Sequence, residues 1–166
     1  PLLAPAAGLG GRLLGGAGSD HVTNDGVFTG GAGFALDLGA GDDELNLLGG
    51  SLINGVAHGG DGIDTLILGG TTGVLDVSTF SAAFTSFEHT IMRALLVTIT
   101  GNGTLHLTVD QGTVNVLGNV IGTIEAGAGA SGVEIIVQPS GSITAGSPAV
   151  VLGGTENLLF NAGTIR

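Results

Sequence analysis

The sequence predicts an all-β fold, a parallel β-helix in which each coil consists of short strands joined by tight turns. Glycine supplies 34 of the 166 residues and the apolar content is 43%, which is typical of many short strands and turns rather than of a disordered chain. Two motifs also recur with a period of about 20 residues, and coils of this length stack about 4.8 Å apart through parallel backbone hydrogen bonds. The chain is therefore expected to make about eight coils.

The motif of the C-terminal part is a glycine, then Thr or Ser, then an aliphatic residue. Its glycines are Gly103, Gly122, Gly141 and Gly163, so the step is constant between the first three copies and slightly longer before the fourth. Because equivalent residues of successive coils stack, we expect one inward-facing column made of Leu105, Ile124, Ile143 and Ile165. The same step predicts two more columns, Val97 with Val116 and Ile135, and Val114 with Val133 and Leu152.

The motif of the N-terminal part is Gly-x-Gly-x-Asp-x-aliphatic. Its copies begin at Gly16, Gly39 and Gly60, so they share nearly the same period. We expect residues 1–166 to be a single β-helix segment of a longer protein. Within it, residues 1–14 are a lead-in or first coil, residues 15–100 are Gly/Asp-rich coils and residues 101–166 are Gly-Thr-Ile coils. The best candidate for a helix, residues 79–96, is rich in Thr and Ser and is expected to be strand and loop.

The charge balance excludes several classes of partner. The chain has 14 acidic and three basic residues, a net charge of −11, and neither lysine nor cysteine. Nucleic acids and anionic membranes require a basic surface, and a disulfide framework or thiolate metal site requires cysteine. No apolar run is long enough for a membrane helix. A surface of Thr, Asn, Ser and Gly without lysine favours an extracellular or cell-surface location.

Three stretches of the sequence resemble repeats of a known group of proteins. The unit Asn161-Ala162-Gly163-Thr164-Ile165, the run from Gly59 to Leu68 and the run from Ser86 to Ile91 are similar to repeats of autotransporter passenger domains. The resemblance implies a right-handed parallel β-helix that is exported across two membranes to the bacterial cell surface. It also implies a role in adhesion, aggregation or biofilm formation.

The aspartate motif also resembles the calcium-binding nonapeptide Gly-Gly-x-Gly-x-Asp-x-aliphatic-x. Residues 15–23 and 59–67 fit this pattern, and the copy beginning at Gly39 departs from it only at Leu38. The resemblance implies calcium beside Asp20, Asp43 and Asp64, which stacking would place in one column. The copies are a whole coil apart, however, so each coil supplies only half a site. The alternative is that Asp and Gly simply shape a solvated turn.

Catalytic residue types occur, but not in catalytic patterns. Ser19, Asp20 and His21 are adjacent, so on a strand they point to opposite faces and form no relay. The acidic run 42–44 offers a carboxylate pair for glycoside cleavage, yet the chain lacks the Trp, Tyr and basic residues of a sugar cleft. The phenylalanines are expected to form internal stacks, and His58 and the other histidines to lie on the surface.

We therefore expect a scaffold rather than an enzyme, with no catalytic residue and no cofactor other than the calcium considered above. Its expected partners are surface glycans or proteins, or further copies of itself, and we expect no membrane insertion of this segment. The alternative is a calcium-binding or self-assembling fibre module. A polysaccharide-cleaving β-helix is less favoured.

Overall fold

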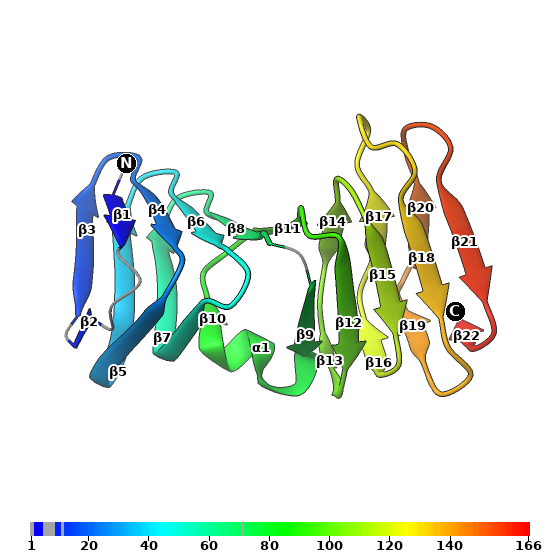
Figure 1. Cartoon of the computed structure of the whole chain (residues 1–166), viewed down its shortest axis with the longest axis horizontal. Helices are drawn as coiled ribbons and strands as arrows, with labels where there is room; N and C mark the ends of the chain where they lie inside the picture. Colours follow the sequence, from blue (N-terminus) through cyan, green and yellow to red (C-terminus); the bar gives the residue numbers. More distant parts are fainter. Residues whose placement is uncertain (1, 5–8, 11, 71) are drawn as a thin grey trace. The chain divides into compact units, whose positions relative to one another are not determined.

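The computed structural model describes residues 2–4, 9–10, 12–70 and 72–166. They form the right-handed parallel β-helix that the sequence predicts, with about 7 coils of roughly 23 residues, so the coils are fewer and longer than expected. The chain divides into two compact units. Unit 1 comprises residues 1–70 and 82–90, and unit 2 comprises residues 71–81 and 91–166. Each unit is a stack of parallel strands (Figure 1).

Unit 1 is built on two sheets in its described part. Its strands are β1 (Leu2–Ala4), β2 (Leu9–Gly10), β3 (Leu13–Ala17), β4 (His21–Asn24), β5 (Val27–Ala40), β6 (Glu44–Leu47), β7 (Leu52–Asp61), β8 (Thr65–Leu68) and β10 (Phe84–Thr85). One sheet has the order β1-β4-β6-β8, and the other has the order β10-β7-β5-β2 with β3 also paired to β5. The strand β11 (His89–Met92) begins in unit 1 and ends in unit 2.

The core of unit 1 consists of inward columns that run from coil to coil. Val22, Leu45 and Leu66 are register partners and are at most 3% exposed. His21 and Thr23 flank Val22 and point to the outer face, because successive side chains of a strand alternate. Each copy of the N-terminal motif therefore supplies one coil, as the sequence predicts.

Unit 2 is built on three sheets in its described part. Its strands are β9 (Thr72–Asp76), β12 (Leu96–Thr100), β13 (Asn102–Thr104), β14 (Leu107–Val109), β15 (Thr113–Val116), β16 (Asn119–Ile121), β17 (Ile124–Ala126), β18 (Glu134–Val137), β19 (Ser142–Thr144), β20 (Val150–Leu152), β21 (Leu158–Asn161) and β22 (Thr164–Ile165). One sheet has the order β9-β12-β15-β18-β21, and a second has the order β13-β16-β19-β22. The third begins at the end of β11 and continues with β14-β17-β20.

The inward columns of unit 2 do not keep a constant step. Val97 lies in register with Val114, Val114 with Ile135, and Ile135 with Leu159. The separation along the chain grows with each of these three pairings, as the residue numbers show. Val97, Val114 and Ile135 are all buried, so the column is the core of this sheet.

The predicted column of Leu105, Ile124, Ile143 and Ile165 is therefore wrong as a register, although its first three members are buried. Ile124 stacks between Leu107 and Val150, on a different sheet from Ile143. Ile143 stacks on Ile165 as predicted, but its other partner is Val120. The two further columns predicted with the same step also join residues that are not register partners, since Val116 pairs with Ile99 and Val114 with Val97.

The cause is the length of the turns. Three residues, 110–112, join β14 to β15, whereas seven residues, 127–133, join the next pair of strands, β17 and β18. Likewise two residues join β16 to β17 and five join β19 to β20. Residues inserted at the corners lengthen a coil without disturbing the strands. A motif with a fixed spacing thus falls on one sheet in one coil and on another sheet in the next.

A short helix, α1 (Val77–Ala83), occupies part of the segment expected to be strand and loop. Asp76 caps it, because the Asp76 carboxylate accepts hydrogen bonds from the Ser78 backbone N–H at 3.0 Å and from the Ser78 hydroxyl at 2.6 Å. These hydrogen bonds lower the pKa of Asp76. The N-cap aspartate was the available sequence signal for this helix. Among the described residues, no helix is long and apolar enough to span a membrane.

Candidate functional site

The glycines of the N-terminal motif make its tight coil-to-coil stacking possible. Gly39 and Gly60 are register partners with φ of +106° and +123°, a backbone conformation that favours glycine. A Cβ on Gly39 would overlap the carbonyl oxygen of Gly16, and a Cβ on Gly60 would overlap the carbonyl oxygen of Gly39. Both the conformation and the space therefore require glycine, and this stacking fixes the position of the aspartate that follows.

Those aspartates stack in one column, which we call the Asp column. The Asp20 backbone N–H donates to Asp43 Oδ1 at 2.7 Å, and the Asp43 backbone N–H donates to Asp64 Oδ1 at 2.8 Å. The Asp64 backbone N–H donates to Glu88 Oε2 at 2.8 Å. Each carboxylate thus accepts a hydrogen bond from the equivalent residue of the preceding coil. The sequence predicts the three aspartates, but the motif does not include Glu88, which lies one coil after Asp64.

The column places carboxylates in an unfavourable environment. Asp43 is 2% exposed and Asp64 is 0% exposed, and the Oδ2 atom of each lacks a hydrogen-bond partner among the residues that the structure describes. Burial raises the pKa of Asp64, and the carboxylates of Asp43, Glu88 and Asp42 raise it further, against the opposing effect of the Asp43 N–H. The Asp64 carboxyl therefore holds its proton to a higher pH than a solvated aspartate.

The unpaired Oδ2 atoms are the part of the column that fits a cation, since carboxylate oxygens are the ligands that calcium prefers. In the part of the chain that the structure describes, however, no group of three or more His, Cys, Asp or Glu side chains is arranged to hold a metal ion. Calcium beside Asp20, Asp43 and Asp64 therefore stays a prediction.

The acidic run 42–44 is used in contacts between coils. Asp42 Oδ1 accepts the backbone N–H of Ile63 at 2.9 Å, and Asp43 belongs to the Asp column. Glu44 Oε1 lies 3.2 Å from Nε2 of His21 on the neighbouring strand. These partners give the three side chains a structural use.

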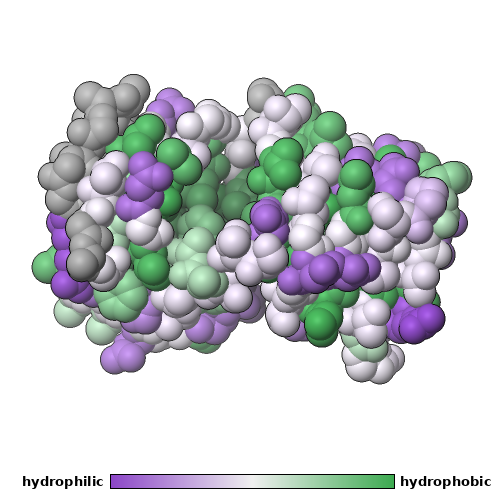
Figure 2. Space-filling view, turned by 90° about the horizontal axis from the view of Figure 1, so that it is seen from below, coloured by the Kyte–Doolittle hydropathy of each residue, from purple (hydrophilic) through white to green (hydrophobic). Residues whose placement is uncertain are grey.

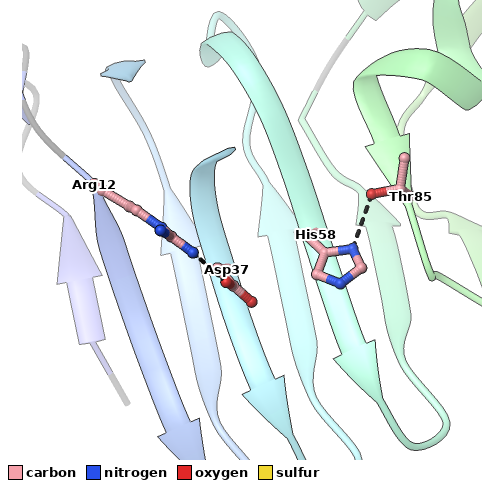
Figure 3. Close-up of polar contacts among 4 residues, drawn as sticks. All are labelled: Arg12, Asp37, His58 and Thr85. Atoms are coloured by element: carbon pink, nitrogen blue, oxygen red, sulfur yellow. Dashed lines mark hydrogen bonds and ion pairs between the residues drawn. The ribbon is translucent and has the colours of Figure 1, made fainter. Parts of the chain in front are cut away.

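A second cluster lies on the outer face of unit 1, on the sheet that contains β5 and β7 (Figure 3). Asp37 and His58 are register partners, and so are His58 and Thr85. Arg12, which precedes β3, forms an ion pair with Asp37. His58 Nδ1 lies 2.9 Å from Thr85 Oγ1. We call these residues, together with Phe34, the outer-face cluster.

Phe34 joins the cluster through its ring. The rings of Phe34 and His58 are stacked, with centroids 4.5 Å apart and planes 5° from parallel, and the Arg12 guanidinium carbon is 5.8 Å from the Phe34 centroid. An aromatic pair contributes about 0.5–1.5 kcal/mol and an exposed cation–π contact about 0.5–1 kcal/mol. Asp37 is paired with Arg12, so the cluster has a structural role, which is to join neighbouring coils.

The sequence did not predict the outer-face cluster. Phe34 was expected to stack internally, and His58 was expected on the surface without a role. A usable signal existed, because the separation of Asp37 and His58 along the chain equals that of Asp43 and Asp64. Tracing that spacing through outward-facing positions would have found the pair. Phe160 is likewise 58% exposed rather than internal.

The raised pKa of Asp64 predicts an unusual pH dependence of stability. Because the folded chain binds the Asp64 proton more tightly than the unfolded chain does, this residue adds stability as pH falls through its folded pKa, and the gain is complete below its unfolded pKa. Asp64→Asn should remove that contribution. On going from about pH 7 to about pH 4, the free energy of unfolding of the parent chain should rise more, or fall less, than that of Asp64→Asn. Denaturant titration at the two pH values measures this difference. The exposed Asp25→Asn is the control, and equal pH dependence in all three proteins would contradict the assignment.

The calcium hypothesis predicts a higher melting temperature in millimolar calcium than in chelator, since a ligand that binds only the folded state stabilises it. Asp43→Asn, in the middle of the Asp column, should abolish the difference. Identical melting curves of the parent chain in the two buffers would rule the hypothesis out.

Comparison with protein-family models, curated proteins and solved structures finds no significant match for this chain. The solenoid that the passenger-domain resemblance implied is present.

Proposed function

We propose that this chain is an extracellular, surface-displayed β-helical scaffold that acts through repeated contacts of its outer faces, in adhesion or aggregation. The observation that carries the proposal is the alignment of outward polar side chains into ladders. On one sheet of unit 2 the Asn119 amide donates to Asn102 Oδ1, and the Ser142 hydroxyl donates to Asn119 Oδ1 at 2.8 Å. Successive coils therefore present equivalent hydrogen-bonding groups at one regular spacing.

The other sheets of unit 2 carry ladders of the same kind. The Thr108 hydroxyl donates to Glu125 Oε1 at 3.0 Å on one sheet, and the Gln138 amide donates to Asn115 Oδ1 at 2.8 Å on another. Groups that repeat about every 4.8 Å suit a partner that also repeats. Each contact is weak, but many contacts formed together raise the apparent affinity through multivalency.

The surface is also mixed in character. Hydrophilic and hydrophobic residues are interspersed on the face seen in Figure 2. On the sheet β9-β12-β15-β18-β21 of unit 2, several outward side chains are large and apolar, and Leu158 and Phe160 are 56% and 58% exposed. Exposed apolar side chains favour contacts with another macromolecule. These exposed side chains favour self-association, in which the partner is another copy of the chain. The other candidate partners are surface glycans or proteins.

The passenger-domain resemblance supports the same proposal and adds the location, the outer surface of a bacterium. Catalysis is not part of the proposal. The acidic residues considered for glycoside cleavage are occupied in contacts between coils, and the Asp37 carboxylate is paired with Arg12. A reacting group instead has to be free to meet a substrate in a concave site.

Association should grow with ionic strength, because salt screens the repulsion between copies that each carry a net charge of −11. Light scattering of the full chain, and clumping of beads coated with it, measure this association. Phe160→Asp, which adds a charge to the outer apolar positions, should reduce it, whereas Ala128→Asp in an exposed turn should not.

Two results would contradict the proposal. One is a monomeric chain at every ionic strength whose beads adhere neither to one another nor to cell surfaces. The other is turnover of a polysaccharide, ester or peptide substrate that Asp43→Asn abolishes, because that result would make the chain an enzyme.

A further inference from the structure

The chain contains two Asn-Gly dipeptides, Asn54-Gly55 in β7 of unit 1 and Asn102-Gly103 in β13 of unit 2. Both asparagines are exposed. In an unfolded chain both asparagines would lose their side-chain amide at similar rates, because the glycine that follows each of them places no side chain in the way. The folded structure treats them differently. We infer that Asn54 is a site of spontaneous self-modification, at which the side-chain amide becomes a carboxylate, and that Asn102 is protected.

The chemistry needs only the chain and water. The backbone nitrogen of the glycine attacks the asparagine Cγ, a new N–Cγ bond forms, the Cγ–Nδ2 bond breaks, and ammonia leaves with the glycine N–H proton. Water then opens the resulting five-membered imide at one of its two carbonyls. Opening at Cγ gives aspartate, and opening at the backbone carbonyl gives isoaspartate, in which the chain continues through Cβ and Cγ. The attack requires the asparagine and the glycine to leave the extended, paired conformation of a strand.

Asn102-Gly103 is held in that paired conformation. Asn102 and Gly103 are register partners of Asn119 and Val120 on β16, and the Asn102 side-chain oxygen accepts a hydrogen bond from the Asn119 amide. The Gly103 backbone is also confined, since a Cβ there would overlap the Val77 carbonyl oxygen. Reaction at Asn102 requires this ladder to open first.

Asn54-Gly55 lies where the pairing of β7 is interrupted. Asn54 pairs with Thr29 and Val56 pairs with Phe34, so Gly55 alone is opposite the four residues 30–33 of β5. Gly55 has a φ of +130°, and the nearest atom to a Cβ placed on it is the Ala35 Cβ at 3.0 Å. The only hydrogen bond of the Asn54 side chain among the described residues is a long one of 3.3 Å to the Thr29 hydroxyl. At Asn54, therefore, less structure has to open than at Asn102 before the glycine nitrogen can approach Cγ.

The irregularity also accommodates the products. Isoaspartate adds one backbone atom, which shifts the register of a regular ladder, whereas the strand opposite Asn54 already departs from regular register. The new carboxylate can accept a hydrogen bond from the Thr29 hydroxyl that Asn54 now contacts. The modification therefore adds a negative charge to the outer face of unit 1 without unfolding it.

The test incubates the full chain at mildly alkaline pH and follows both dipeptides by peptide mapping and mass spectrometry, with isoaspartate measured separately. We expect conversion at Asn54 to be at least about tenfold faster than at Asn102, since local openings of a folded protein span a wide range of free energies. In denaturant the two rates should become similar. Asn54→Gln should remove most of the conversion, and Asn119→Ala, which deletes the partner of Asn102, should accelerate conversion at Asn102.

The inference fails if Asn102 converts as fast as Asn54 in the folded chain. It also fails if Asn54 stays intact under conditions in which the denatured chain converts, or if the difference between the two sites persists in denaturant. The last result would assign the difference to local sequence rather than to the fold.

Discussion

The parallel backbone ladder between successive coils is the constraint on which the rest of the structure depends. It places equivalent backbones about 4.8 Å apart, and the packing between coils follows from that closeness. Gly39 and Gly60 are required because their neighbours leave no room for a Cβ. Inward positions become columns such as Val22, Leu45 and Leu66, and outward positions become ladders. A coil has little interior of its own, so its apolar residues are buried only by the coils on either side.

The same stacking that buries the aliphatic residues also aligns like charges. In the Asp column it places Asp43 next to Asp64 in successive coils, and burial together with the neighbouring carboxylates raises the pKa of Asp64. The arrangement persists because each carboxylate accepts a backbone N–H of the preceding coil, which needs a partner at that corner. The unpaired Oδ2 atoms are the residual cost. A proton on Asp64 would relieve part of that cost, so the stability of unit 1 is expected to depend on pH.

What could be predicted from the sequence depended on whether the coil length stays constant. In unit 1 the aspartate motif keeps a nearly constant step from Asp20 to Asp43 and Asp64, and its column was predicted correctly. In unit 2 the turns between strands change from three to seven residues, so an assumed constant step joined Ile124 to Ile143 across two sheets. Burial of both residues was still predicted, because the alternation within a strand does not depend on the turns.

Other features were missed for different reasons. The helix α1 replaces part of a coil, and only its N-cap, Asp76, indicates it in the sequence. The outer-face cluster depends on which side of the sheet Phe34 and His58 occupy, and that is set by the register shift in β5. Glu88 continues the Asp column although it lies outside the glycine motif. Each of these is a local departure from the repeat, and a periodic pattern carries no information about departures.

Stacked inward columns, which the backbone ladder keeps in register, stabilise the fold. Ile143 and Thr144 allow the inner and outer faces to be compared, because they are adjacent on β19 and point to opposite faces, with Ile143 at 0% exposure and Thr144 exposed. The measurement is the free energy of unfolding of Ile143→Asp and Thr144→Asp against the parent chain. We expect Ile143→Asp to cost more than the ~2–5 kcal/mol of a buried Ile→Ala change and Thr144→Asp to stay within about 0.5 kcal/mol. Equal losses in the two variants would contradict this expectation.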